Sequence, residues 1–402
     1  MPVGTIKTPK LHPVTGIKIA TVKAGIRYVG RKDLVLFAIE DSATVSAVFT
    51  KNHFCAAPVQ ICREHLQTTS PRYLIINTGN ANAGTGIEGM EAARQVCKTL
   101  ATKAKVPAAS ILPFSTGVTV EKLPVDRIVA GLDGLLEKLD VNGWNDAAEG
   151  IMTTDTVPKG ATVKFSIDGE EVTITGITKG SGMIKPNMAT MLSFIGTDVA
   201  VAKEELDLML LTACDKSFNR ITVDGDTSTN DSCVLMASSR GVKLDTDKKR
   251  EKFLEQLIKL QQTLAQNMVQ DAEGATKFIT IKVSGGASSG ECLNAAYIIA
   301  HSPLVKTAFF ASDPNWGRIM VALGNCKIKE FDVSKVNIWL GEVKVLENGA
   351  MAQSYTEESG SKVMRKEQII VRIDLGRGSY KESVWTSDLS HDYITINADY
   401  RT

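Results

Sequence analysis

Near its middle the chain reads Lys179-Gly-Ser-Gly-Met-Ile-Lys-Pro-Asn-Met-Ala-Thr190. So many glycine, proline and asparagine residues predict an irregular turn rather than a helix or a strand. Residues 191–201, which follow, are mostly apolar and predict a strand that is buried on both faces. Thr190 therefore stands where a loop meets a buried strand. This position suits a chemically active residue, and it also suits an ordinary β-branched residue that begins the strand.

Composition limits the kind of protein that this chain can form. Its 402 residues, 43% of them apolar, can bury roughly three quarters of the unfolded surface in one large or two medium domains. The 46 Lys and Arg residues nearly balance the 45 Asp and Glu residues, which argues against a nucleic-acid or membrane-surface partner. No apolar run reaches the roughly 18 residues of a membrane span, and the N-terminus lacks a signal-peptide core. A soluble, cytoplasmic protein is expected.

The cysteines indicate neither a disulfide framework nor a metal site. They are odd in number and scattered, at positions 55, 62, 97, 214, 233, 292 and 326, without a Cys-x-x-Cys pair. This usage is typical of reduced cysteines in a cytosolic protein. His53, Cys55 and Cys62 could in principle share a metal ion, but their spacing matches no zinc pattern. We expect no metal.

The first half of the chain alternates predicted strands, small-residue loops and helices. A loop at 77–84 follows an apolar strand, and a second small-residue corner lies at 111–118 and contains a Thr-Gly pair. Alternation at period two on either side of Asp168-Gly169 predicts a hairpin. The expected strands are 34–39, 44–49, 73–76, 161–167 and 171–175, and the expected helices are 89–105, 125–139 and 145–152.

The second half contains two stretches that resemble ligand-binding loops but fail on chemistry. Residues 222–231 are as polar as a calcium loop, but in a loop that begins at Asp224 the sixth and twelfth positions hold Thr229 and Leu235 instead of Gly and Glu. Residues 285–290 resemble a phosphate loop, but Glu291 occupies the position that needs lysine. The expected helices are 203–219 and 246–269, the expected strands are 278–283, 369–375 and 384–386, and a β-rich run at 394–402 is expected to be ordered.

The stretch from Lys179 to Thr190 resembles the self-cleavage motif of the ornithine acetyltransferases, also called glutamate N-acetyltransferases, and the resemblance extends from about Val14 to Thr402. In that family the bond before the motif threonine, here Ala189–Thr190, is cut autocatalytically. The resemblance implies an α+β fold, an α-β-β-α sandwich. It also implies an alpha chain, 1–189, and a beta chain, 190–402, which stay interleaved and assemble as a heterotetramer of two alpha and two beta chains.

Self-cleavage would solve a chemical problem, because the five histidines lie in no triad-like context and an internal threonine hydroxyl is a weak nucleophile. A cut before Thr190 frees an α-amine on the same residue. Its reference pKa of about 7.7–8.0 leaves a sizeable neutral fraction near neutral pH, so this amine can accept the hydroxyl proton as a general base. The cut would therefore create both the nucleophile and its base.

The resemblance also implies the remaining site residues and the reaction. Thr116 and Gly117 match the oxyanion hole, and Thr190 is the nucleophile of a ping-pong transfer of acetyl from N-acetylornithine to glutamate. Lys179 could hold a carboxylate and Glu273 an ammonium group. Without the resemblance, Lys179 would be interpreted as a solvated loop lysine and Glu273 as a carboxylate at a helix end. No cofactor is needed, and acetyl-CoA as a second donor stays open. The implied substrate contacts are Thr153, Lys179, Thr190, Glu273, Asn397 and Thr402.

Two other interpretations stay open. An N-terminal-nucleophile aminopeptidase or amidohydrolase of the same fold would pass its acyl group to water instead of glutamate. An uncleaved scaffold or small-molecule binder would remain a single full-length chain.

Overall fold

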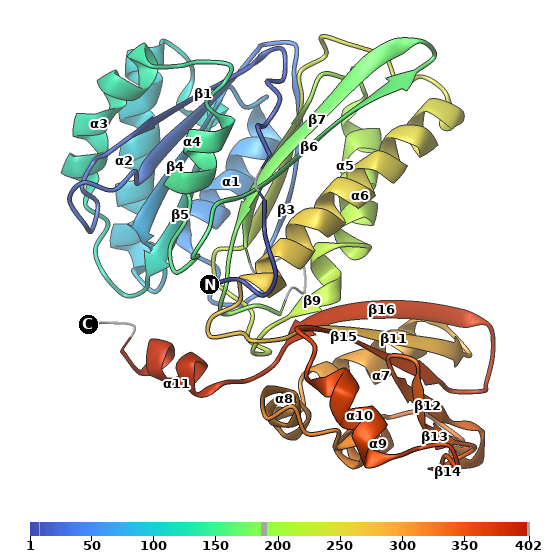
Figure 1. Cartoon of the computed structure of the whole chain (residues 1–402). Helices are drawn as coiled ribbons and strands as arrows, with labels where there is room; N and C mark the ends of the chain where they lie inside the picture. The colour runs from blue at the N-terminus through green and yellow to red at the C-terminus, as the bar shows by residue number, and fades with distance from the viewer. Residues whose placement is uncertain (8, 186–190, 400–402) are drawn as a thin grey trace. The chain divides into compact units, whose positions relative to one another are not determined.

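The computed structural model describes residues 1–402 except 8, 186–190 and 400–402 (Figure 1). The chain divides into two compact units. The larger unit comprises Lys7–Asn219 and Asp226–Met268, and the smaller unit comprises Met1–Ile6, Arg220–Gly225 and Val269–Thr402. In the described part of the chain no helix is long and apolar enough to cross a membrane.

Two sheets form the centre of the larger unit. The first sheet has the strand order β1-β2-β4-β5, in which β4 and β5 run parallel. The second has the order β3-β10-β8-β7-β6. Their bounds are β1 (Ile17–Val22), β2 (Leu34–Ile39), β3 (Thr44–Phe49), β4 (Tyr73–Asn80), β5 (Ile111–Val118), β6 (Lys159–Ile167), β7 (Glu170–Lys179), β8 (Leu192–Thr197) and β10 (Ser232–Ala237).

The two sheets pack face to face, and apolar side chains from both form the core between them. Phe37 from β2 and Phe194 from β8 stack with ring centroids 5.3 Å apart, and Phe114 from β5 meets Phe194 edge-on at 5.1 Å. Aromatic pairs at these separations add attraction beyond the area that they bury. Trp144 of α4 (Trp144–Gly150) is completely buried in the same core.

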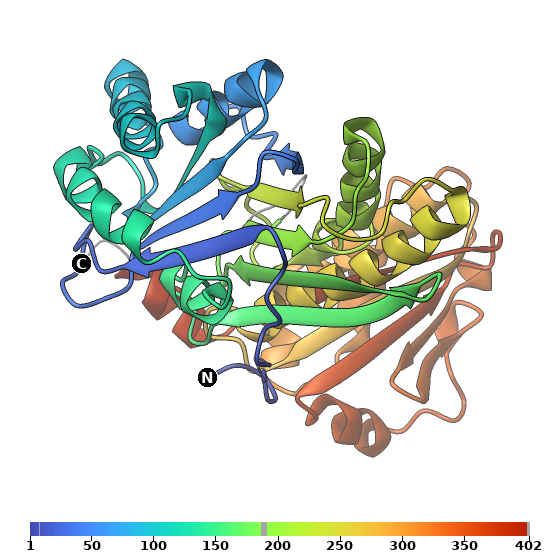
Figure 2. The ribbon, with the colours of Figure 1, turned by 90° about the horizontal axis from the view of Figure 1, so that it is seen from above.

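Helices cover the outer faces of both sheets (Figures 1 and 2). α2 (Gly86–Ala104) and α3 (Val125–Glu137) pack on the first sheet, with α1 (Ala57–Thr68) beside β5. On the second sheet, Ser46 of β3 donates a 2.6 Å hydrogen bond to Asp207 of α5 (Lys203–Asp215). α6 (Asp247–Gln270) packs over β7 there, since a Cβ at Gly176 would lie 3.1 Å from two of its leucines. The predicted α-β-β-α sandwich is therefore confirmed.

In the second sheet β8 and β10, which follow the Ala189–Thr190 bond, lie between β7 and β3, which precede it. β8 pairs antiparallel with β7 and parallel with β10, and β10 pairs antiparallel with β3. Every residue of β8 is buried, as the apolar run after position 190 predicted. Separating the two pieces would therefore break backbone pairing through the middle of a sheet. Cleavage itself stays a prediction.

The smaller unit is built on one mixed sheet of order β14-β13-β12-β15-β11-β16-β9. Alternate residues of β11 and β15 point into a core that α7, α8, α9 and α10 complete. The strands are β9 (Ile221–Thr222), β11 (Phe278–Gly286), β12 (Asn337–Leu340), β13 (Val343–Glu347), β14 (Ala350–Met351), β15 (Gln368–Asp374) and β16 (Tyr380–Ser387), and the helices are α7 (Ser289–Ala300), α8 (Pro303–Phe310), α9 (Trp316–Gly324) and α10 (Glu357–Met364).

Three local predictions were wrong. The loop predicted at 77–84 begins only after Asn80, where β4 ends. Residues 111–118, predicted as a corner, form β5, because they pair in parallel with β4 along their length and so satisfy the backbone groups that face it. The β-rich run expected at 394–402 is instead helical over α11 (His391–Ala398), up to where the described residues end at 399. The Ser390 hydroxyl caps α11 by accepting a hydrogen bond from the Tyr393 N–H. The residues after the cap include β-branched Ile394, Thr395 and Ile396, but β propensity depends strongly on context and does not prevent the capped helix here.

Candidate active site

The parallel strands β4 and β5 end together and bring the predicted oxyanion pair onto rigid backbone. Gly79 and Gly117 lie opposite each other, and the register shifts at Asn80. Gly117 has φ +133°, and a Cβ there would lie 2.3 Å from the carbonyl carbon of Gly79. Only glycine fits such a position. The close contact between Gly117 and Gly79 fixes the backbone next to Thr116. Donors of an oxyanion hole must be held in place in this way before the reaction begins.

A network of buried amide side chains supports this strand end. Asn230 donates through Nδ2 to the carbonyl oxygens of Ala81 at 2.6 Å and Ser115 at 2.9 Å. The Ser115 hydroxyl in turn donates to Asn77 Oδ1 at 2.6 Å. Asn230 therefore links the loop before β10 to the residue that precedes Thr116. Reasoning from the sequence missed it, because Asn230 stood out only as part of a rejected calcium loop.

Lys179 lies at the end of β7 and reaches the oxyanion pair. Its Nζ donates to Thr116 Oγ1 at 3.3 Å. This bond joins the first residue of the 179–190 stretch to Thr116 within the larger unit. Thr116, Gly117 and Lys179 are thus three predicted site residues that the structure gathers at one point.

A buried carboxylate, Asp155, organises the backbone around Lys179. The Asp155 side chain is completely inaccessible to solvent, and it accepts from Lys159 Nζ at 2.6 Å and from the Gly180 N–H at 2.7 Å. Its second oxygen accepts from the Thr153 N–H at 2.9 Å. Burial alone would raise the pKa of Asp155, but Lys159, Lys179 and the Gly180 N–H together hold this pKa well below its usual range. Asp155 is therefore ionised and fixes the turn that carries Thr153.

A second buried carboxyl, that of Asp231, has its pKa shifted in the opposite direction. It lies immediately before β10 and is 2% exposed. Burial raises the pKa of Asp231 well above its usual range, and hydrogen bonds from Ser228 and the Met191 N–H, with the charge of Lys179, offset this only in part. Neither Asp155 nor Asp231 was singled out from the sequence, because no local pattern reports burial of an isolated aspartate.

In the smaller unit, Glu273 and Asn397 lie side by side. Asn397 Nδ2 donates to Glu273 Oε2 at 2.9 Å. The Ser390 hydroxyl donates to the Gly274 carbonyl oxygen at 2.6 Å while it caps α11. This double use of Ser390 fastens the helix that carries Asn397 to the turn that carries Glu273. The two predicted substrate contacts thus form one local cluster.

The remaining predicted residues, Ala189, Thr190 and Thr402, lie outside the described residues. The predicted site residues that are described form two groups. Thr116, Gly117, Thr153 and Lys179 belong to the larger unit, and the Glu273–Asn397 cluster belongs to the smaller one.

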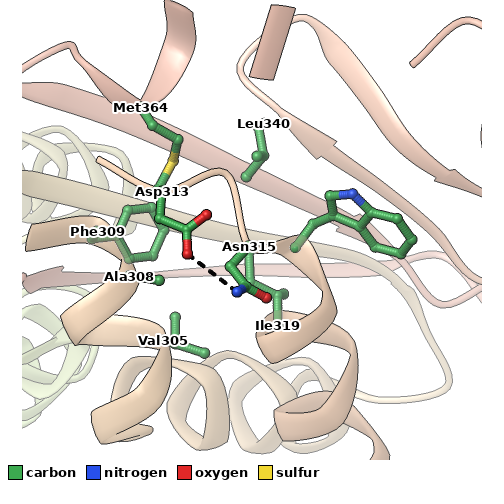
Figure 3. Close-up of a pocket in the computed structure, with 9 residues that line it drawn as sticks. Val305, Ala308, Phe309, Asp313, Asn315, Ile319, Leu340 and Met364 are labelled. Carbon is green, nitrogen blue, oxygen red and sulfur yellow. Dashed lines mark hydrogen bonds between the residues drawn. The ribbon is translucent and has the colours of Figure 1, made fainter. Parts of the chain in front are cut away.

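A separate pocket in the smaller unit lies among α8, α9, α10 and β12 (Figure 3). Its wall is mainly apolar, and Asn315 donates to Asp313 at 3.2 Å across its polar side. The cavity volume of ≈ 10 Å³ accommodates about one water molecule. It is therefore too small for an amino-acid substrate. Within the described ranges no cluster of His, Cys, Asp or Glu has metal-binding geometry.

Known proteins are similar to this chain over nearly its whole length. Residues 18–402 match the model of the ArgJ family. Two relatives named "Arginine biosynthesis bifunctional protein ArgJ", from Pseudomonas fluorescens and Pseudomonas syringae pv. tomato, are each 50% identical over 406 residues, covering 100% of both chains. A crystal structure of the protein of that name from Bacillus halodurans is 34% identical, covers 50% of this chain and 95% of that chain, and has a TM-score of 0.47.

Proposed function

This chain belongs to the ArgJ family and is an acetyltransferase of arginine biosynthesis, and from that premise we propose that it moves the acetyl group of N-acetylornithine to glutamate. The products are ornithine and N-acetylglutamate. The observation that carries the proposal is the bond from Lys179 Nζ to Thr116 Oγ1, which joins the start of the 179–190 stretch to the candidate oxyanion pair.

The proposal begins with self-cleavage between Ala189 and Thr190. The Thr190 hydroxyl attacks the Ala189 carbonyl carbon, the C–N bond breaks, and the resulting ester is opened by water. The Thr116 hydroxyl and the Gly117 N–H stabilise the oxyanion that forms in each tetrahedral intermediate. Cleavage frees the α-amine of Thr190, which serves as the general base in later turnovers.

Acetyl transfer then follows a ping-pong course. The Thr190 hydroxyl attacks the acetyl carbonyl of N-acetylornithine and passes its proton to the α-amine. Ornithine departs with that proton and leaves acetyl-Thr190. The amino group of glutamate attacks this ester, and the proton that it loses returns to the Thr190 oxygen through the same amine. No cofactor takes part in these steps.

Charge complementarity supports amino-acid substrates. Lys179 would bind a carboxylate by a charge-assisted hydrogen bond, and Glu273 would bind an ammonium group. Asn397, Thr153 and Thr402 would supply neutral hydrogen bonds, and Thr190 would hold the reacting acetyl group. We propose that the two cleaved chains function together as two alpha and two beta chains.

An acetyl-transfer assay tests the proposal. Purified protein is mixed with glutamate and either N-acetylornithine or acetyl-CoA, and N-acetylglutamate is measured. Product from N-acetylornithine alone indicates a recycling enzyme, and product from both donors a bifunctional one. Release of ornithine without N-acetylglutamate indicates the hydrolase alternative. Intact mass should show pieces 1–189 and 190–402, and Thr190→Ala should give one full-length species without activity. A single uncut wild-type species would contradict the proposed mechanism.

A further inference from the structure

Asp231 is held next to the cleavage segment by the sheet itself. In the parallel pairing of β10 with β8, Ser232 lies opposite Leu192, and the Ser232 N–H donates to the Met191 carbonyl oxygen at 2.9 Å. On the other side, the Thr50 N–H donates to the Asp231 carbonyl oxygen at 2.9 Å. The backbone of Asp231 is therefore fixed between β3 and β8, beside Met191.

The Asp231 carboxyl contacts the first described residue after the predicted cut. It accepts a hydrogen bond from the Met191 N–H, and Ser228 donates to it as well. Covalent geometry keeps the nitrogen of residue 190 within about 3.7 Å of the Met191 nitrogen in any conformation. A group that is hydrogen-bonded to the Met191 N–H therefore lies one residue along the backbone from the nitrogen that departs when the Ala189–Thr190 bond breaks.

One oxygen of this carboxyl is unused in the described chain. Asp231 Oδ2 is buried and finds no hydrogen-bond partner among the described residues. A buried oxygen without a partner costs about 1–3 kcal/mol, so such an atom is expected to have a function. The Asp231 carboxyl thus presents one anchored side and one side that is available for proton exchange.

We propose that Asp231 donates the proton that the departing nitrogen of Thr190 requires during self-cleavage. The inference rests on the self-cleavage proposed above. As the C–N bond breaks, the carboxyl gives its proton to the nitrogen, and the proton of the Thr190 hydroxyl returns to the carboxylate. The products are the Ala189 ester on the Thr190 oxygen, a free amine and a regenerated carboxyl. No further acid or base is consumed.

The electrostatics of the site suit a proton donor. Burial raises the pKa of Asp231 well above its usual range, which favours the protonated carboxyl that a proton donor requires. Lys179 exerts the largest charge effect on Asp231. Lys179 also acts on the ionised Asp155, which offsets part of its charge. The hydrogen bond from Lys179 to Thr116 keeps donor and oxyanion pair in the same region.

Asp231→Asn tests the inference, because asparagine keeps the shape and the acceptor for the Met191 N–H but cannot donate an acidic proton. The chain is made by cell-free synthesis, and the appearance of pieces 1–189 and 190–402 is followed by intact mass at several pH values. The wild-type cleavage rate should fall as pH rises through the pKa of Asp231. Asp231→Asn should cleave roughly 10²–10⁴-fold more slowly and lose that pH dependence.

Asp198→Asn is the matched control. Asp198 follows the opposite end of β8, burial also raises its pKa, and its carboxyl accepts from the Thr173 N–H at 3.1 Å. This variant makes the same chemical change in the same unit and should cleave like wild type.

Ser228→Ala is the second test. It removes a hydrogen bond that favours the Asp231 carboxylate, so the fall in rate should move to higher pH.

The outcomes separate the two proposals. A wild-type rate or pH profile in Asp231→Asn would overturn the inference and leave the proposed function intact. If Asp231→Asn is insoluble, Ser228→Ala decides, and an unshifted profile overturns the inference. An equal loss of cleavage in Asp198→Asn would also overturn it, because the effect would then be structural. A wild-type chain that stays uncut overturns the proposed self-cleavage itself.

Discussion

Replacing Asp155 by asparagine should destabilise the larger unit strongly, because it removes the carboxylate that pairs with the buried Lys159 ammonium group. Both side chains of this pair are completely inaccessible to solvent, and the bond between them is 2.6 Å long. Breaking a buried ion pair by removing one partner typically costs about 3–5 kcal/mol, in contrast to the small effect of exposed pairs. At roughly 2–4 °C per kcal/mol, the melting temperature should fall by roughly 6–20 °C.

Thermal unfolding followed by circular dichroism measures this effect. The matched control is Asp146→Asn, which breaks the pair with Lys32, where the aspartate side chain is 65% exposed. This control should lower stability by at most about 1 kcal/mol. Asp155→Asn combined with Lys159→Met should recover part of the loss, since it also removes the buried charge that Asp155 had balanced. The reasoning is refuted if Asp155→Asn melts within the range of the exposed control.

Three further predictions concern other parts of the molecule. Gly117→Ala should lower the acetyl-transfer rate about 10²–10³-fold, because the added methyl group collides with Gly79 and displaces an oxyanion donor. The measurement is kcat of soluble protein whose fold is unchanged. Ser390→Ala should lower the stability of α11 by about 1 kcal/mol, because it removes the N-cap. It should raise KM more than it lowers kcat, since α11 carries the predicted substrate contact Asn397. Equal changes in KM and kcat would count against this. Burial lowers the pKa of Lys306 to about 8, below the value near 10.4 that is expected in the unfolded chain. Between about pH 8 and pH 10 the unfolded state therefore binds more protons than the folded state, and the free energy of unfolding should rise with pH. Lys306→Met should flatten that rise when melting temperatures are measured across this pH range.

Local sequence patterns were sufficient wherever one segment carries its own signal. The apolar run after position 190 predicted β8, and the alternation on either side of Asp168-Gly169 predicted the β6–β7 hairpin. The 179–190 stretch identified the family, which the match over residues 18–402 bears out. Patterns were weakest near the C-terminus, where β-branched residues suggested a strand and the Ser390 cap produced a helix instead.

The site residues missed from the sequence share one property. Asn230 reaches Ser115 across 115 positions of the chain, and Asp155 meets Gly180 across 25. Such contacts depend on which strands become neighbours, and no short-range pattern encodes that choice. The polar character of these residues was visible, but their burial and their partners were not.

The sequence by itself determined the family, the main strands and helices of the sandwich, and the residue types on which a self-made nucleophile would depend. Only the tertiary structure decided that the pKa of Asp155 lies well below its usual range while the pKa of Asp231 lies well above it, although both are buried aspartates. The physical reason is that a carboxyl group responds to the charges and donors that the fold brings within a few ångströms. Lys159 and Lys179 outweigh the effect of burial on Asp155, whereas at Asp231 the effect of burial outweighs Lys179 and the hydrogen bonds.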